Sequence, residues 1–270
     1  MSLSAVRHLL PGAVAGVAAF VFSRVMIEPL TGAAIDYEGE REHAEAHLAG
    51  AHGHGHEHGE LFSRAVQENL GAATGIVAFA VVLGVLYAVA YQVLQAVLER
   101  RGHRPDPVTT ALLLAAGMGL AVTVLPALKY PANPPGVGVD DTVAERSSAF
   151  LTVTAVSALA AVVAVGVAVR WAREWGVWRA VGAAVGGYLA VMLVVFAAAP
   201  SFHEAPGPLH DAGGGLVFPG FPAELLADFR MYSLLNHVLL WLVIGVVFAA
   251  LVSRTRSTDA EALGSEVAVA

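Results

Sequence analysis

Cysteine is absent from this 270-residue chain, so neither a disulfide framework nor a thiolate metal site is available to it. Charged side chains are also scarce, at 14% of residues, whereas average soluble domains carry about a quarter. Hydrophobic residues make up 57% of the chain, and the mean hydropathy is +0.67. These values exclude an ordinary soluble globular domain and indicate a polytopic α-helical membrane protein.

Basic side chains are few as well, and the net charge is −7. This balance argues against nucleic acid as a partner. Lys129 is the one lysine, and Tyr130 follows it, whereas a Walker A motif needs Gly-Lys followed by Ser or Thr. The chain therefore cannot house a standard P-loop ATPase, and any ATP-driven step must belong to a partner. No cofactor is expected.

Long apolar runs define the expected fold, an all-α bundle of about six transmembrane helices in one domain over residues 1–253. Each run is near the roughly 20 residues that a helix needs to cross about 30 Å of hydrocarbon. Residues 254–270 are expected to form a disordered cytoplasmic tail. The expected spans are about Leu9–Ile27, Leu70–Leu98, Val108–Leu128, Ala149–Val169, Trp178–Ala199 and Tyr232–Val252.

Arginines between these spans predict the orientation in the plasma (inner) membrane. The short connections on one side are arginine-rich, and the long connections on the other side are mainly acidic. The positive-inside rule then places both termini in the cytoplasm. The first span resembles a cleavable signal peptide, but its length and the lack of a clean A-x-A site favour a retained helix. The arginines on the expected cytoplasmic side are Arg7, Arg100, Arg101, Arg104, Arg170, Arg173, Arg179, Arg254 and Arg256.

Residues 36–60 form a polar stretch that is expected to be an extracytoplasmic loop after the first span. Neutral imidazole is a good ligand for Co, Ni, Zn and Cu(II), whereas the lack of thiolates makes Cu(I) a poor candidate. His43 and His47 are four residues apart, so one helical face can present both. Glycine separates most of the later histidines, which favours exchanging capture over one fixed geometry. The alternatives are a disordered acidic loop or a segment that titrates near pH 6.5. The predicted metal ligands are His43, His47, His52, His54, His56 and His58.

Polar residues at membrane depth predict an inner path for the ion. Arg24 and Glu28 are four residues apart near the outer end of the first span, and Asn236 and His237 lie about one turn inside the last. Ionisable residues within spans are usually functional and face the bundle interior. A hydrogen-bonded structural role for His237 is an equally supported alternative. His203-Glu204 is a further candidate for an outer vestibule.

Small residues recur four apart in three spans, beginning at Gly12, Gly71 and Gly182. Such spacing allows close helix packing in lipid, and this interpretation is favoured over an inverted-repeat transporter. Residues 126–135 contain four prolines and predict a rigid start to an outer loop.

Four motifs resemble the CbtA family of probable cobalt transporter subunits, and they span nearly the whole chain. They are Arg24–Pro29, the His/Glu-rich stretch, Lys129–Pro135 with the sequence Lys-Tyr-Pro-Ala-Asn-Pro-Pro, and Phe221–Arg230. The resemblance implies cobalt uptake linked to cobalamin supply. It also implies a small companion membrane subunit, CbtB.

The favoured hypothesis is a membrane subunit that takes up a divalent metal ion, with membrane lipid and CbtB as its partners. A sensor or scaffold that transports nothing is the main alternative. Transport of nickel or zinc, and export, are further alternatives. An enzyme is not expected, because no nucleophile–base pair or fixed metal triad with catalytic spacing is present.

Overall fold

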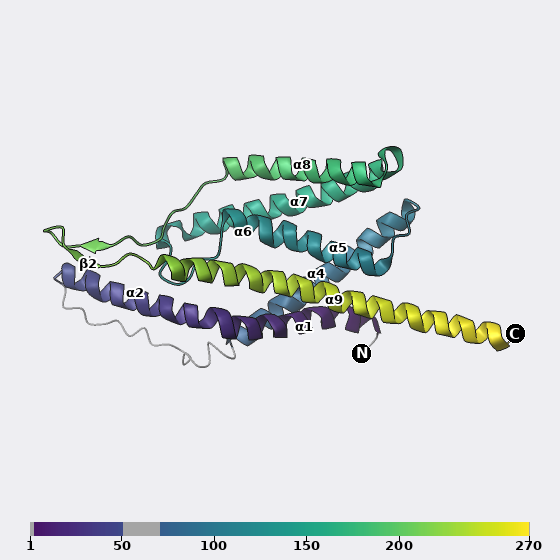
Figure 1. Ribbon diagram of the computed structural model, residues 1–270, viewed down its shortest axis with the longest axis horizontal. Helices are drawn as coiled ribbons and strands as arrows, with labels where there is room; N and C mark the ends of the chain where they lie inside the picture. The colour runs from purple at the N-terminus through teal and green to yellow at the C-terminus, as the bar shows by residue number, and fades with distance from the viewer. Residues whose placement is uncertain (1–2, 51–70, 270) are drawn as a thin grey trace.

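The computed structural model describes residues 3–50 and 71–269, and it describes side chains for residues 8–50 and 71–254. Within these ranges the chain is almost entirely helical (Figure 1). Six of the described helices are long and apolar enough to cross a membrane, which confirms the expected all-α membrane fold. The elements are α1 (Leu3–Phe22), η1 (Ser23–Ile27), α2 (Glu28–Leu48), α4 (Ala72–Arg100), α5 (Pro107–Gly119), η3 (Leu120–Val124), α6 (Leu125–Lys129), η4 (Asp140–Thr142), α7 (Val143–Trp175), α8 (Val177–Ala198), β1 (Leu209–His210), β2 (Leu216–Phe218) and α9 (Ala223–Val269).

Helix α9 is central to the bundle. It packs against α1 on one side and α5 on the other, and α1 in turn packs against α4. Helices α7 and α8 form a hairpin at the edge of the bundle, which α7 joins through η3 and α6 (Figure 1). The main core lies between α1, α4, α5 and α9, where Tyr87, Ile244 and Phe248 are buried.

Glycines bring α1 and α4 into close contact. A Cβ atom on Gly12 would lie 2.5 Å from the carbonyl oxygen of Ala80, and one on Gly84 would lie 2.8 Å from the Cα of Gly12. By contrast, a Cβ on Gly75 or Gly182 would meet no described atom within 4 Å. Of the three small-residue repeats, the one at Gly12 therefore makes a close helix contact.

Two π-helical turns interrupt the spans, and each ends two residues before a proline. Segment η1 precedes Pro29, and η3 precedes Pro126. Proline cannot donate the helical hydrogen bond, and its ring crowds the carbonyl four residues earlier. That carbonyl lies inside the π-helical turn in both cases, so the wider turn relieves the clash and lets the helix continue. The rigid loop start predicted from residue 126 is therefore wrong in its first part, because α6 remains helical through Lys129.

The expected loop over residues 36–60 is wrong in its first part, because α2 remains helical through Leu48. Alanine and glutamate favour helix there, and Arg41 Nε forms an i,i+4 ion pair with Glu45 Oε1 at 2.9 Å. The helix ends before Gly50, whose φ is +64°. His52, His54, His56 and His58 lie outside the described residues.

Other helices also extend beyond their apolar runs. Helix α7 begins at Val143 rather than near residue 149, and α9 begins at Ala223 rather than near residue 232. Helix α9 also continues to Val269, where a disordered tail from residue 254 was expected. Hydropathy marks the stretch that lipid can cover, whereas the backbone hydrogen bonds of a helix can continue into water.

Candidate functional site

A polar cap covers one end of the bundle. We define the cap as α2 together with residues 130–142 and 199–222, which include the β1–β2 hairpin. The α4–α5 and α7–α8 turns lie at the opposite end (Figure 1). The predicted capture and vestibule residues that the structure describes are all in the cap.

Lys129 and Tyr130 join the end of α6 to the end of α8. Lys129 Nζ donates to the carbonyl oxygen of Phe196 at 3.1 Å and to Ser201 Oγ at 3.0 Å. The Tyr130 hydroxyl donates to the Pro200 carbonyl oxygen at 2.7 Å, and burial raises the pKa of that hydroxyl. Their side chains therefore hold two spans together at the base of the cap.

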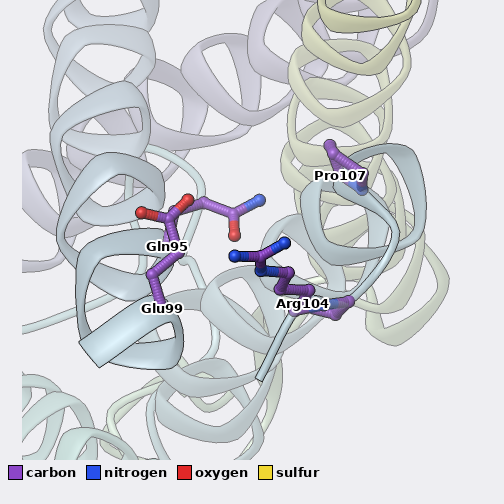
Figure 2. Close-up of a pocket in the computed structure, with 5 residues that line it drawn as sticks. Gln95, Glu99, Arg104 and Pro107 are labelled. Carbon is purple, nitrogen blue, oxygen red and sulfur yellow. The ribbon is translucent and has the colours of Figure 1, made fainter. Parts of the chain in front are cut away.

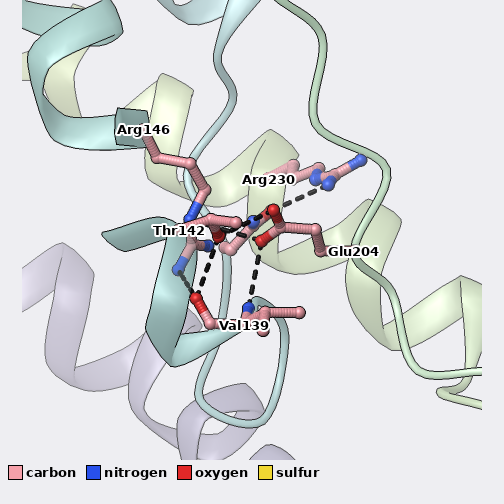
Figure 3. Close-up of polar contacts among 6 residues, drawn as sticks. Val139, Thr142, Arg146, Glu204 and Arg230 are labelled. Carbon is pink, nitrogen blue, oxygen red and sulfur yellow. Dashed lines mark hydrogen bonds and ion pairs between the residues drawn. The ribbon is translucent and has the colours of Figure 1, made fainter. Parts of the chain in front are cut away.

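Glu204 closes the loop before α7 (Figure 3). Its carboxylate accepts a hydrogen bond from Thr142 Oγ1 at 2.7 Å and one from the Val139 amide at 3.0 Å. Arg146 Nε lies 3.3 Å from the same carboxylate. The Thr142 hydrogen bond is the main reason that the pKa of Glu204 is lowered, although burial opposes it; the Val139 amide and Arg146 also contribute. The carboxylate predicted for a vestibule is thus engaged in holding the loop.

A second arginine attaches the proline-rich run to α9. Arg230 donates to Asn133 Oδ1 at 2.7 Å. Asn133 comes directly after Pro131-Ala132 and before two further prolines, which restrict the backbone on either side of it. Residues 129–135 therefore link the ends of α6 and α8 to the start of α9.

Helix α2 is docked on the rest of the cap through one face. The Tyr37 hydroxyl donates to the Pro219 carbonyl oxygen at 3.1 Å, and its ring contacts Phe218 and Phe221 at centroid distances of 5.3 and 4.8 Å. Arg41 donates to the Gly207 carbonyl oxygen at 2.7 Å. These contacts fix α2 as a continuation of α1, and together with η1 the helix is about 69 Å long at 1.5 Å per residue. Because lipid hydrocarbon is about 30 Å thick, α2 extends well beyond it.

The opposite face of α2 carries four exposed side chains of the types that bind metal ions, in one line. Asp36, Glu40, His43 and His47 follow one another at intervals of four, three and four residues, and all four are exposed. That spacing places them on one helical stripe. No three His, Asp or Glu side chains are grouped to hold a metal ion anywhere in the described ranges. The predicted pair His43 and His47 thus lies on an exposed stripe of α2, and two carboxylates precede it on the same stripe.

The four predicted inner-path residues lie on η1, on the first residue of α2 and on α9. Segment η1, which carries Arg24, contacts α9, and the rings of Phe22 and Tyr232 are 6.4 Å apart between these elements. Arg24 is exposed, and Glu28 is partly buried.

On α9, Asn236 and His237 differ in their surroundings. His237 is exposed, and its Nδ1 lies 2.8 Å from the Ser233 carbonyl oxygen. Since a carbonyl only accepts, Nδ1 is the donor in this contact, and in a neutral ring the lone pair that can bind a metal is then on Nε2. Asn236 Oδ1 is buried and has no hydrogen-bond partner.

The docking contacts of α2 and the role of Thr142 were not predicted from the sequence. The α2 contacts had one local signal, because Tyr37 and Arg41 are four residues apart in an otherwise acidic stretch. Thr142 had none, because Glu204 lies 62 residues away from it.

The family model described as "Probable cobalt transporter subunit (CbtA)" matches residues 4–253. Comparisons with curated proteins and with solved structures returned no match.

Proposed function

This chain belongs to the CbtA family of probable cobalt transporter subunits, and from that premise we propose that it is the membrane subunit of an uptake system for divalent cobalt. One observation carries the proposal, namely the exposed Asp36–Glu40–His43–His47 stripe on a helix that is fixed to the cap through its other face.

Capture begins on this stripe. Carboxylates raise the local concentration of cations near them, and imidazole nitrogen then replaces water in the first shell of Co²⁺. A pair of histidines on one helix offers two ligands and leaves the remaining positions to water, so the ion is bound without being trapped. The predicted ligands His52, His54, His56 and His58 follow the stripe directly in the sequence and extend the same chemistry.

From the stripe the ion passes towards the bundle at the boundary of α1 and α9. Glu28 is the first residue of α2, and Asn236 and His237 lie on the neighbouring helix α9. The buried, unpartnered Oδ1 of Asn236 and the Nε2 of His237 supply neutral ligand atoms at that depth. Arg24 contributes a positive charge near Glu28 that limits how tightly a cation is held there.

The cap faces the outside of the cell in this proposal, because the expected cytoplasmic turns are arginine-rich and lie at the other end of the bundle. The chain has no P-loop, so any ATP-driven step belongs to a partner. The companion is the small subunit CbtB, and the cobalt supplies cobalamin synthesis.

Uptake of ⁵⁷Co²⁺ at limiting concentration tests the proposal in cells that lack the native gene. We expect a His43→Ala/His47→Ala chain to accumulate less cobalt than the native chain, and the chain with all six predicted histidines replaced to accumulate the least. His210→Ala is the matched control, because it removes an exposed cap histidine that is not on the stripe. Unchanged accumulation in the six-histidine variant would exclude the capture role. Reconstitution with the companion in liposomes separates transport from sensing, since a sensor gives no cobalt flux.

A further inference from the structure

Six exposed arginines gather at the end of the bundle opposite the cap. We call this region the basic end and define it as residues 98–107, around the α4–α5 turn, and residues 170–179, around the α7–α8 turn. It contains three acidic residues, so it is positive in a protein whose net charge is −7. The exposed arginines are Arg100, Arg101, Arg104, Arg170, Arg173 and Arg179.

A hydrogen bond joins the α4–α5 turn to the α7–α8 turn, so the two turns form one surface. The Arg173 guanidinium donates a hydrogen bond to the carbonyl oxygen of Arg101, 72 residues away in sequence. The intervening Gly102 has a φ of +74°, and a Cβ there would lie 2.8 Å from the Arg173 side chain. The positive φ favours glycine at this position.

Tryptophans place this surface at the level of the lipid headgroups. Three of the four tryptophans of the chain lie in residues 170–179. The rings of Trp171 and Trp175 are 4.4 Å apart, and Trp178 is 89% exposed. Exposed tryptophan next to the end of a spanning helix is typical of the membrane interface. A lipid headgroup therefore fits this surface better than an acidic soluble protein.

A polar hollow of about 600 Å³ lies beside the α4–α5 turn. Gln95 and Glu99 line it from α4, and Arg104 faces them from the turn (Figure 2). Arg104 offers N–H donors, and arginine binds phosphate oxygens through paired hydrogen bonds. Gln95 Nε2 donates one hydrogen to the Tyr91 hydroxyl at 2.8 Å, which leaves its second hydrogen for a ligand. Glu99 is the acidic group of the lining, and it lowers the attraction for an anion without filling the hollow.

We propose that the basic end binds an anionic phospholipid, with the phosphate on Arg104 in this hollow and the surrounding arginines and tryptophans at the interface. The site is independent of the cobalt proposal, because it lies at the other end of the bundle and shares no residue with the stripe or the inner path.

Tryptophan fluorescence provides the test, since three of the four fluorophores are at the site and the fourth, Trp241, is buried at 4% exposure. The purified chain is reconstituted into phosphatidylcholine bilayers that contain brominated phosphatidylglycerol or brominated phosphatidylcholine, whose bromines quench tryptophan on contact. We expect quenching by the phosphatidylglycerol at a lower mole fraction, and we expect added salt to weaken this preference.

Three variants assign the preference to the basic end. Each arginine near an anionic surface contributes roughly fivefold to binding, so Arg100→Gln/Arg101→Gln/Arg104→Gln should weaken the preference by up to about a hundredfold. The corresponding triple lysine variant keeps the positive charge and should keep most of the preference for phosphatidylglycerol. Glu99→Gln removes a negative charge and should strengthen this preference. Circular dichroism checks that each variant is as helical as the native chain. Equal quenching by the two lipids in the native chain, or an unchanged preference in the glutamine variant, overturns the proposal.

Discussion

The Tyr37 hydroxyl donates a hydrogen bond to the carbonyl oxygen of Pro219, 182 residues further along the chain. This bond connects α2 to the segment before α9. Around it, Tyr37, Phe218 and Phe221 form a small apolar cluster outside the bundle core, together with Ala34 and Val137. The cluster holds one face of α2 against the cap and leaves the opposite face exposed.

The first prediction concerns this attachment. Tyr37→Phe removes the hydrogen bond and keeps the ring, so it should lower the free energy of unfolding by about 0.5–1.5 kcal/mol and leave α2 docked. Tyr37→Ala also removes the ring contacts and should release α2 from the rest of the cap. Spin labels at positions 43 and 210 measure the result by electron paramagnetic resonance. We expect a narrow distance distribution in the native chain and in Tyr37→Phe, and a broad one in Tyr37→Ala. Distance distributions of equal width in the native chain and both variants would show that the aromatic cluster does not hold α2 against the cap.

The second prediction concerns pH. The pKa of Glu204 is lowered in the folded protein, chiefly by the hydrogen bond from Thr142. A lowered folded pKa stabilises the protein above the unfolded pKa, roughly 4.3 for glutamate, and this stabilisation is lost as the pH falls through the folded value. We therefore expect the difference in thermal midpoint between the native chain and Glu204→Gln to shrink as the pH is lowered from 7 to 3. When both chains also carry Thr142→Val, the difference in thermal midpoint caused by Glu204→Gln at pH 7 should be smaller, because the main cause of the lowered pKa is removed. A gap between native and Glu204→Gln chains that stays constant over this range would contradict the assignment.

The third prediction concerns the contact between α1 and α4. A Cβ on Gly12 would lie 2.5 Å from a backbone oxygen and 2.7 Å from the Val81 Cα, and neither atom belongs to a flexible side chain. Gly12→Ala should therefore destabilise the fold by about 1–3 kcal/mol through overpacking. Gly182→Ala is the matched control, since its Cβ would have no described atom within 4 Å and alanine favours helix by about 1 kcal/mol. Denaturation in mixed detergent micelles compares the two variants, and similar losses in both would contradict the close packing described for Gly12.

Several features of the fold were predictable from local sequence. Apolar runs of about 20 residues identified the six spans, because lipid hydrocarbon has a set thickness and requires continuous hydrogen bonding along the backbone. The His43–His47 pair was predictable because a spacing of four residues places side chains on one face of any helix. The helix ends were not predictable in this way. Helices α2, α7 and α9 continue into polar sequence that hydropathy does not distinguish from a loop.

Tertiary structure decided what surrounds the predicted residues. The Glu204 carboxylate is of a type that binds metal ions, but Thr142, Val139 and Arg146 engage it. These partners lie around the start of α7, more than 50 residues away in the chain. His43 and His47 remain exposed because Tyr37 and Arg41, on the other face of the same helix, bind the cap. Local sequence determines which side chains share a helical face, since helix geometry is the same everywhere. Only the packing of distant segments determines which face is covered, because that depends on contacts between residues that the sequence keeps far apart.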